Sequence, residues 1–153
     1  MGENKEYKMP TVMWHNVLME NATVSRAPLM TSLRLDLQTV EAGVSVATMA
    51  SFVSSSGLEF SELYDVVIPA RTLKHRKARK EPLSRDESDK LARLIRIYDQ
   101  TVRVLGDREK ALHWLRKPLR RFAGRTPLEM LRTEFGARMV EEMLGQLDYG
   151  MFA

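Results

Sequence analysis

The chain has 153 residues, of which 44% are hydrophobic and 29% are charged, and its formal net charge is +4. A chain of this size and composition can bury a hydrophobic core, so it is expected to fold as one domain or as two small units that share a core. It contains no cysteine, which excludes disulfides, thiolate catalysis and cysteine-ligated zinc.

No segment is expected to enter a membrane. The first ten residues mix both charges and contain no apolar core of the kind that a signal peptide needs. The longest uncharged run, Ala42 to Leu58, is too rich in Ser, Thr and Gly to span a bilayer. We therefore expect a cytoplasmic protein without a membrane partner.

Residues 1–44 form an N-terminal arm in this prediction, and only part of the arm is expected to be ordered. Residues 1–30 show no sustained period and contain Pro10 and Pro28. Ser32–Val40 alternates polar and apolar residues, as a half-buried strand does. No second strand is evident to pair with it, so an extended arm or a short helix remains equally open.

Regular structure is expected from about Ser45 onwards. Apolar residues at helical spacing over Val46–Val53 predict a helix that Gly57 can close. A short helix over Phe60–Val66, with Leu63 facing inward, is followed by a turn and by a second helix over Ala70–Lys80. Pro69 suits the first turn of that helix.

The strongest helix signal lies in the second half of the chain. Ser84 and Glu87 form a capping box, and apolar residues then keep to one face as far as Leu105, where Gly106 stops the helix. Three further helices are expected, each with its own cap. They are Arg108–Lys117 after Asp107, a short helix from the Thr126/Glu129 capping box to about Arg132, and a last helix after Thr133 with the stripe Met139, Val140, Met143, Leu144 and Leu147. No strand is secure, so the predicted fold class is all-α.

The helix over Ala70–Lys80 carries six Lys or Arg residues and no acid. A short helix, a tight turn and then a basic helix is the layout of a helix-turn-helix, whose second helix enters the major groove of DNA. Leu73 would dock this helix on the core, while its polar side chains reach phosphates and base edges. A solvated basic face is the alternative. The candidate DNA-binding residues are Arg71, Thr72, Lys74, His75, Arg76, Lys77 and Arg79.

The sequence offers no active site. His15, His75 and His113 lie in different segments, and none has a metal-ligand partner at helical spacing. There is no glycine-rich phosphate loop and no nucleophile elbow. We therefore expect no catalytic residue, no metal and no cofactor.

Two runs in the second half, GDREKALHWLRKP from Gly106 and GRTPLEMLRTEFGARMVEEMLGQLDYGMFA from Gly124, resemble a known protein family. They are similar to the toxin-binding domain of Xre/MbcA/ParS-type antitoxins. Upstream, SELYDVVIPARTLKHRK and LSRDESDKLARL resemble the Xre helix-turn-helix and its following helix. The most specific matches are the run from Gly124 to Leu131, the Gly136–Arg138 triplet and Tyr149-Gly150. Within the family, the similarity is greatest to the Xre antitoxins that are paired with RES-domain toxins.

This resemblance implies a helix-turn-helix region over residues 45–83 and a toxin-binding domain with a C-terminal tail over residues 84–153. It also implies a homodimer that binds a cognate RES-domain toxin, blocks the active site of this NAD-degrading enzyme with its C-terminal region, and represses its own operon by binding operator DNA. The toxin-binding residues that it implies are Arg138, Tyr149, Gly150, Met151, Phe152 and Ala153.

The functional alternatives belong to different classes. Phe152 could fold back on its own domain instead of entering a toxin. The chain could be a stand-alone helix-turn-helix regulator without a toxin, or the antitoxin of a ParT-like ADP-ribosyltransferase. A small enzyme is disfavoured. The operator sequence, the stoichiometry and the residues of the dimer interface do not follow from the sequence.

Overall fold

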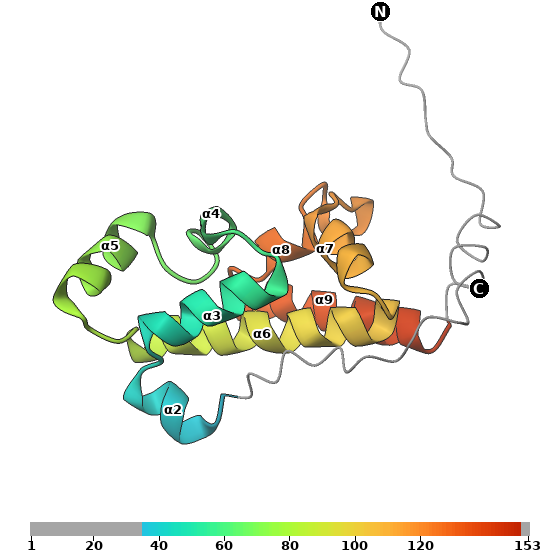
Figure 1. Ribbon diagram of the computed structural model, residues 1–153. Coiled ribbons are helices and arrows are strands. Elements are labelled where there is room, and N and C mark those ends of the chain that lie inside the picture. Colours follow the sequence, from blue (N-terminus) through green and yellow to red (C-terminus); the bar gives the residue numbers. More distant parts are fainter. Residues whose placement is uncertain (1–34, 151–153) are drawn as a thin grey trace, which may run out of the picture.

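A computed structural model describes residues 35–150, and every regular element within this range is helical. Figure 1 shows the long helix α6 crossing the molecule, with α5 extending near its first residues and α7 lying over its opposite end. The all-α prediction is confirmed. In chain order the helices are α2 (Leu37–Ala42), α3 (Val46–Ser56), α4 (Phe60–Leu63), α5 (Ala70–Arg79), α6 (Arg85–Leu105), α7 (Arg108–Arg116), the 3-10 helix η1 (Arg120–Phe122), α8 (Pro127–Met130) and α9 (Glu134–Asp148).

Helix α6 is the central element of the fold. The predicted capping box is present: Ser84 Oγ accepts from the Glu87 amide at 3.2 Å, and a Glu87 carboxylate oxygen accepts from the Ser84 amide at 2.7 Å. The helix ends at Gly106, whose φ of 69° suits glycine. Helices α2, α7 and α9 all pack against α6, so it links the N-terminal and C-terminal parts of the described chain.

One core serves the whole described chain. A single cluster of buried apolar side chains reaches from Val44 to Leu144. Near its centre, the Tyr98 ring meets the Phe52 ring edge to face with centroids 5.6 Å apart, and the Tyr98 hydroxyl donates to the Ser56 carbonyl at 2.7 Å. A buried phenol needs such an acceptor. Tyr98 therefore ties α3 to the middle of α6.

The expectation that regular structure begins near Ser45 is wrong, because α2 precedes it. The Asp36 carboxylate accepts from the Thr39 amide at 2.7 Å and caps α2, while Val40 is buried. Of the alternatives for this segment, the short helix is the one that forms among the described residues. An N-terminal cap satisfies the backbone locally, which a strand without a neighbour could not do.

Helix α4 is shorter than the predicted Phe60–Val66, since it ends at Leu63. The next residues form a turn, in which Val66, Val67 and Ile68 are all buried. Burial of three consecutive apolar residues is incompatible with one continuing helical face. Within residues 35–150, no helix has the length and apolarity needed to cross a membrane.

Candidate functional site

Helices α4 and α5 form the candidate DNA-binding surface. The buried turn between them anchors α5 from its N-terminal side, and Leu73, 3% exposed, is the one buried residue of α5. Lys80 closes the helix with a φ of 56°. The remaining length of α5 extends away from the rest of the molecule (Figure 1). This arrangement is the short helix, turn and second helix that the sequence predicts.

Most of the predicted DNA-binding side chains on α5 face solvent. The structure exposes Arg71, Lys74, His75, Lys77 and Arg79, and leaves Thr72 half-buried. The Lys77 ammonium lies 4.5 Å from the centre of the Phe60 ring, so a cation–π contact holds it over α4. Arg79 lies 3.9 Å from a Glu81 carboxylate oxygen and its side chain is 71% exposed. The exposed cations can therefore reach a negatively charged partner.

Arg76 is placed differently from the other predicted residues. Its Nε lies 2.7 Å from Glu87 Oε2, and its Nη1 donates to the Pro82 carbonyl at 3.0 Å. The side chain is 21% exposed. Sequence reasoning grouped Arg76 with the other cations of α5 because a charge run does not show which cation has an acid beside it in space.

A steric contact explains why the first residue of the Gly136–Arg138 triplet is glycine. A Cβ on Gly136 would lie 2.1 Å from the Met130 carbonyl oxygen, so α9 can approach the end of α8 this closely only with glycine here. Thr133 caps α9 by accepting from the Gly136 amide at 3.0 Å. Gly136 thus permits the close approach of α9 to the end of α8.

Helix α9 presents one exposed face along its length. Arg138 is exposed and lies 3.6 Å from Glu134, and Tyr149, at the end of the helix, is 84% exposed. Gly150 follows with a φ of 67°. Phe135, 75% exposed, was missed by the sequence reasoning. Its spacing of three residues from Arg138 and fourteen from Tyr149 was the available signal, since it puts all three on one side of a helix.

Three of the implied toxin-binding residues, Met151, Phe152 and Ala153, lie outside the described residues. His15, the first of the three histidines, also lies outside them. His75 and His113 are exposed on different helices. In the described part of the chain, no cluster of three or more His, Cys, Asp or Glu residues could hold a metal ion.

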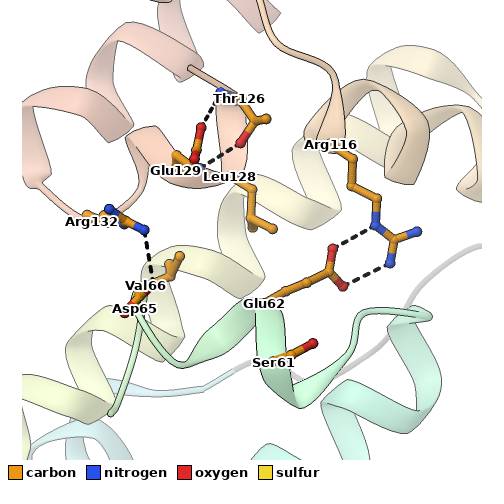
Figure 2. Close-up of a pocket in the computed structure, with 9 residues that line it drawn as sticks. All are labelled: Ser61, Glu62, Asp65, Val66, Arg116, Thr126, Leu128, Glu129 and Arg132. Atoms are coloured by element: carbon orange, nitrogen blue, oxygen red, sulfur yellow. Dashed lines mark hydrogen bonds and ion pairs between the residues drawn. The ribbon is translucent and has the colours of Figure 1, made fainter. Parts of the chain in front are cut away.

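A groove of about 250 Å³ separates α4 from α7 and α8 (Figure 2). Two ion pairs cross it. Arg116 of α7 meets both Glu62 carboxylate oxygens at 2.7 and 2.8 Å, and Arg132 donates to Asp65 at 3.1 Å. The hydrogen bond from Arg116 holds the pKa of Glu62 below its ordinary value of 4.5, and Glu62 raises the pKa of Arg116.

The same groove contains the second predicted capping box. Glu129 accepts from the Thr126 amide at 2.7 Å, and this backbone hydrogen bond is the main reason why the pKa of Glu129 is lowered. All three acids that line the groove therefore accept a hydrogen bond from an arginine or from the backbone. Such paired acids suit a structural joint better than acid–base chemistry.

Two family comparisons match successive parts of the chain. Residues 36–96 match the antitoxin Xre-like helix-turn-helix domain, and residues 100–150 match the antitoxin Xre/MbcA/ParS C-terminal toxin-binding domain. The chain belongs to the Xre/MbcA/ParS antitoxin family. Helix α6, Arg85–Leu105, runs through both matched ranges, so one continuous helix joins the helix-turn-helix domain to the toxin-binding domain.

Individual relatives agree with this assignment. Antitoxin Xre of Pseudomonas putida is 49% identical over 86 residues, which cover 56% of this chain and 54% of the relative. Antitoxin Xre of Yersinia enterocolitica is 34% identical over 87 residues, or 56% of this chain and 59% of the relative. These matches thus span little more than half of the relatives' length. The Prs ADP-ribosylating antitoxin of a Sphingobium species is 26% identical over 124 residues, or 74% of this chain and 78% of that protein.

Proposed function

We propose that this antitoxin binds and inhibits a RES-domain toxin that degrades NAD, and that it blocks the active site of the toxin with its C-terminal region. It also represses its own operon by binding operator DNA. It acts by binding and not by catalysis, in the cytoplasm. The observation that carries the proposal is the combination of a helix-turn-helix with an exposed basic α5 and a matched toxin-binding domain in one fold.

The exposed cations of α5 support the DNA-binding part of this proposal. Arg71, Lys74 and Arg79 extend from a helix that contains no acid and that the buried turn after α4 holds in place. Phosphate contacts from such cations position a recognition helix in the major groove, and base contacts then supply specificity.

The exposed face of α9 supports the toxin-binding part. Phe135, Arg138, Glu142 and Tyr149 are all exposed and share one side of the helix. Large aromatic side chains and arginine are the residues that most often dominate the binding energy of protein interfaces. We propose that this face makes the main toxin contact, and that the segment from Tyr149 to Ala153 extends from it into the toxin's active site.

The antitoxin is proposed to act as a homodimer, as the family resemblance implies, and two-fold symmetry of the dimer would then predict palindromic half-sites in the operator. Light scattering of the chain at micromolar concentration, without toxin, tests this part. A dimer mass is expected, and a monomer mass would exclude a pre-formed dimer.

Co-expression with the neighbouring reading frame tests the function as a whole. The antitoxin is expected to copurify with the toxin that this frame encodes, and the growth defect caused by the toxin alone should disappear. If the frame encodes no toxin and nothing copurifies, the chain is a stand-alone regulator.

A second candidate partner is an ADP-ribosylating toxin. The observation that favours it is the match to the Prs ADP-ribosylating antitoxin, which covers more of this chain than the matches to the Xre antitoxins do. The two partners differ in their products. A toxin that hydrolyses NAD releases free ADP-ribose, whereas an ADP-ribosyltransferase leaves the label of radioactive NAD on a target macromolecule.

A further inference from the structure

Arg76 is the least exposed cation of α5 and contacts both the loop and the helix that follow. Its Nε lies 2.7 Å from one Glu87 carboxylate oxygen, and its Nη2 donates to the other at 3.2 Å. Its Nη1 donates to the Pro82 carbonyl at 3.0 Å. Only 21% of the Arg76 side chain and 12% of the Glu87 side chain are exposed. The two terminal nitrogens of the planar guanidinium donate to the Pro82 carbonyl and the Glu87 carboxylate at once, which a lysine ammonium is less suited to do, whereas the buried Nε makes only the ion-pair contact.

The acceptor of this pair has a second structural role. Glu87 is the third residue of α6, and one of its carboxylate oxygens also accepts from the Ser84 amide at 2.7 Å in the capping box. Arg76 itself belongs to the last turns of α5. The pair therefore joins the end of α5 to the first turn of α6, and the Pro82 carbonyl adds the loop between them.

Helix α5 has few other restraints. Leu73 is its one buried residue. Besides Leu73, the buried turn before Ala70 and the Lys77–Phe60 cation–π contact restrain α5, and few buried apolar contacts oppose a tilt of its C-terminal half. Arg76 lies three residues after Leu73 and so on a neighbouring part of the same face. Arg76 therefore adds a restraint near the C-terminal end of α5 to the one that Leu73 provides.

We propose that Arg76 is a positioning residue for DNA recognition. It fixes the orientation of α5 against α6 through Glu87, so that exposed cations such as Lys74 and Arg79 meet DNA phosphates together, and it does not contact DNA itself. The inference rests on the proposed DNA binding. Under this proposal, Arg76 affects operator affinity through the orientation of α5 and not through a direct contact with DNA.

Conservative lysine variants separate positioning from direct contact. The probe is a DNA duplex that carries the promoter of the antitoxin's own gene, titrated over a series of salt concentrations. Arg79→Lys should bind nearly as wild type, since a lysine also neutralises a phosphate. Arg76→Lys should weaken binding on the order of tenfold to hundredfold, because one or more contacts are misplaced, and should lower the salt slope by about 0.9 for each phosphate contact that is lost. Arg79→Ala should reduce the slope by about 0.9.

Two substitutions of an acid by its amide provide a second test of the positioning role. Glu87→Gln keeps an acceptor for the capping box but removes the charge that holds Arg76. Asp86→Asn, one residue away, removes the same charge from an exposed side chain. Loss of a negative charge near DNA should leave affinity unchanged or raise it. Glu87→Gln should nevertheless weaken binding, whereas Asp86→Asn should not.

The two proposals fail in different ways. Circular dichroism at the assay temperature identifies variants that stay folded, and Glu87→Gln decides the matter if Arg76→Lys does not fold. Arg76→Lys or Glu87→Gln binding as tightly as wild type would overturn the positioning role while DNA binding stands. A wild-type chain that does not bind the duplex, or unchanged affinity and slope for both Arg79→Ala and Lys74→Ala, would overturn DNA binding by α5 and the positioning role with it.

Discussion

At the scale of single residues, steric contacts explain why one position of a family motif is glycine. Gly136 stands where an added Cβ would meet the Met130 carbonyl carbon and oxygen at 2.9 and 2.1 Å, and backbone atoms cannot move aside as a flexible side chain can. Gly145, in the same helix, has nothing within 4 Å of its Cβ position. The two glycines therefore have opposite roles, which the sequence alone does not reveal.

Substitution of these glycines by alanine should change stability in opposite directions. Gly136→Ala should lower the free energy of unfolding by about 1–3 kcal/mol or more, because α9 must shift away from α8. Gly145→Ala should raise it by about 0.5–1 kcal/mol, since alanine loses less backbone entropy in a helix. Urea denaturation of both variants measures this. Equal effects of the two changes would refute the steric explanation.

At the scale of helices, the caps were the most predictable feature. The boxes at Ser84 and Thr126 and the glycine stops at Gly57 and Gly106 all form as predicted, because each depends on residues within one turn. Contacts between helices could not be predicted in this way. The Arg76–Glu87 pair and the Arg116–Glu62 pair join residues of different helices, and periodicity within one helix gives no information on its neighbours.

The exposed cations of α5 should determine the salt dependence of operator binding. Lys74→Ala should weaken binding and lower the slope of log affinity against log salt by about 0.9, because one fewer phosphate counterion is released. Arg103→Ala, an exposed cation of α6, is the matched control and should leave the slope unchanged. Filter-binding titrations over a salt series measure both slopes. An unchanged slope for Lys74→Ala would mean that this side chain makes no phosphate contact.

Because of the ion pair between α4 and α7, the free energy of unfolding should depend on pH. Arg116 lowers the pKa of Glu62 from its ordinary value of 4.5, so the pair stabilises the fold above pH 4.5 and the benefit is lost as pH falls through the lower, folded-state pKa. Glu62→Gln should remove about 0.5–1 kcal/mol at neutral pH and less in acid. Urea denaturation between neutral and acidic pH measures the difference. Glu142→Gln, at an exposed position within α9, is the control and should follow wild type throughout.

At the scale of the whole molecule, the described chain has one hydrophobic core, although the family comparisons divide it into two domains. One buried cluster runs from Val44 to Leu144, and α6 lies across both matched ranges. Length and composition predicted a shared core, and the sequence predicted the helices of both parts. It did not predict which helices pack together, because apolar stripes show which face is buried and not what buries it. The boundary at residues 83 and 84 remains a prediction.

A shared core predicts one cooperative unfolding transition for both parts. Trp114 on α7 is 9% exposed and reports on the C-terminal part, once Trp14 is replaced by Phe. Its fluorescence and the helical circular dichroism signal should lose intensity at the same urea concentration. Two separated midpoints would show that the parts fold independently.

The central claim, that this antitoxin silences an NAD-degrading toxin, is tested most directly by the rate at which the purified partner toxin consumes NAD. Addition of the full chain should abolish NAD consumption. A chain that lacks Tyr149–Ala153 should still bind the toxin through α9 but leave it active, because the segment proposed to enter the active site is absent. Full suppression of NAD consumption by the truncated chain would contradict the proposed block, and undiminished consumption with the full chain bound would contradict the central claim itself.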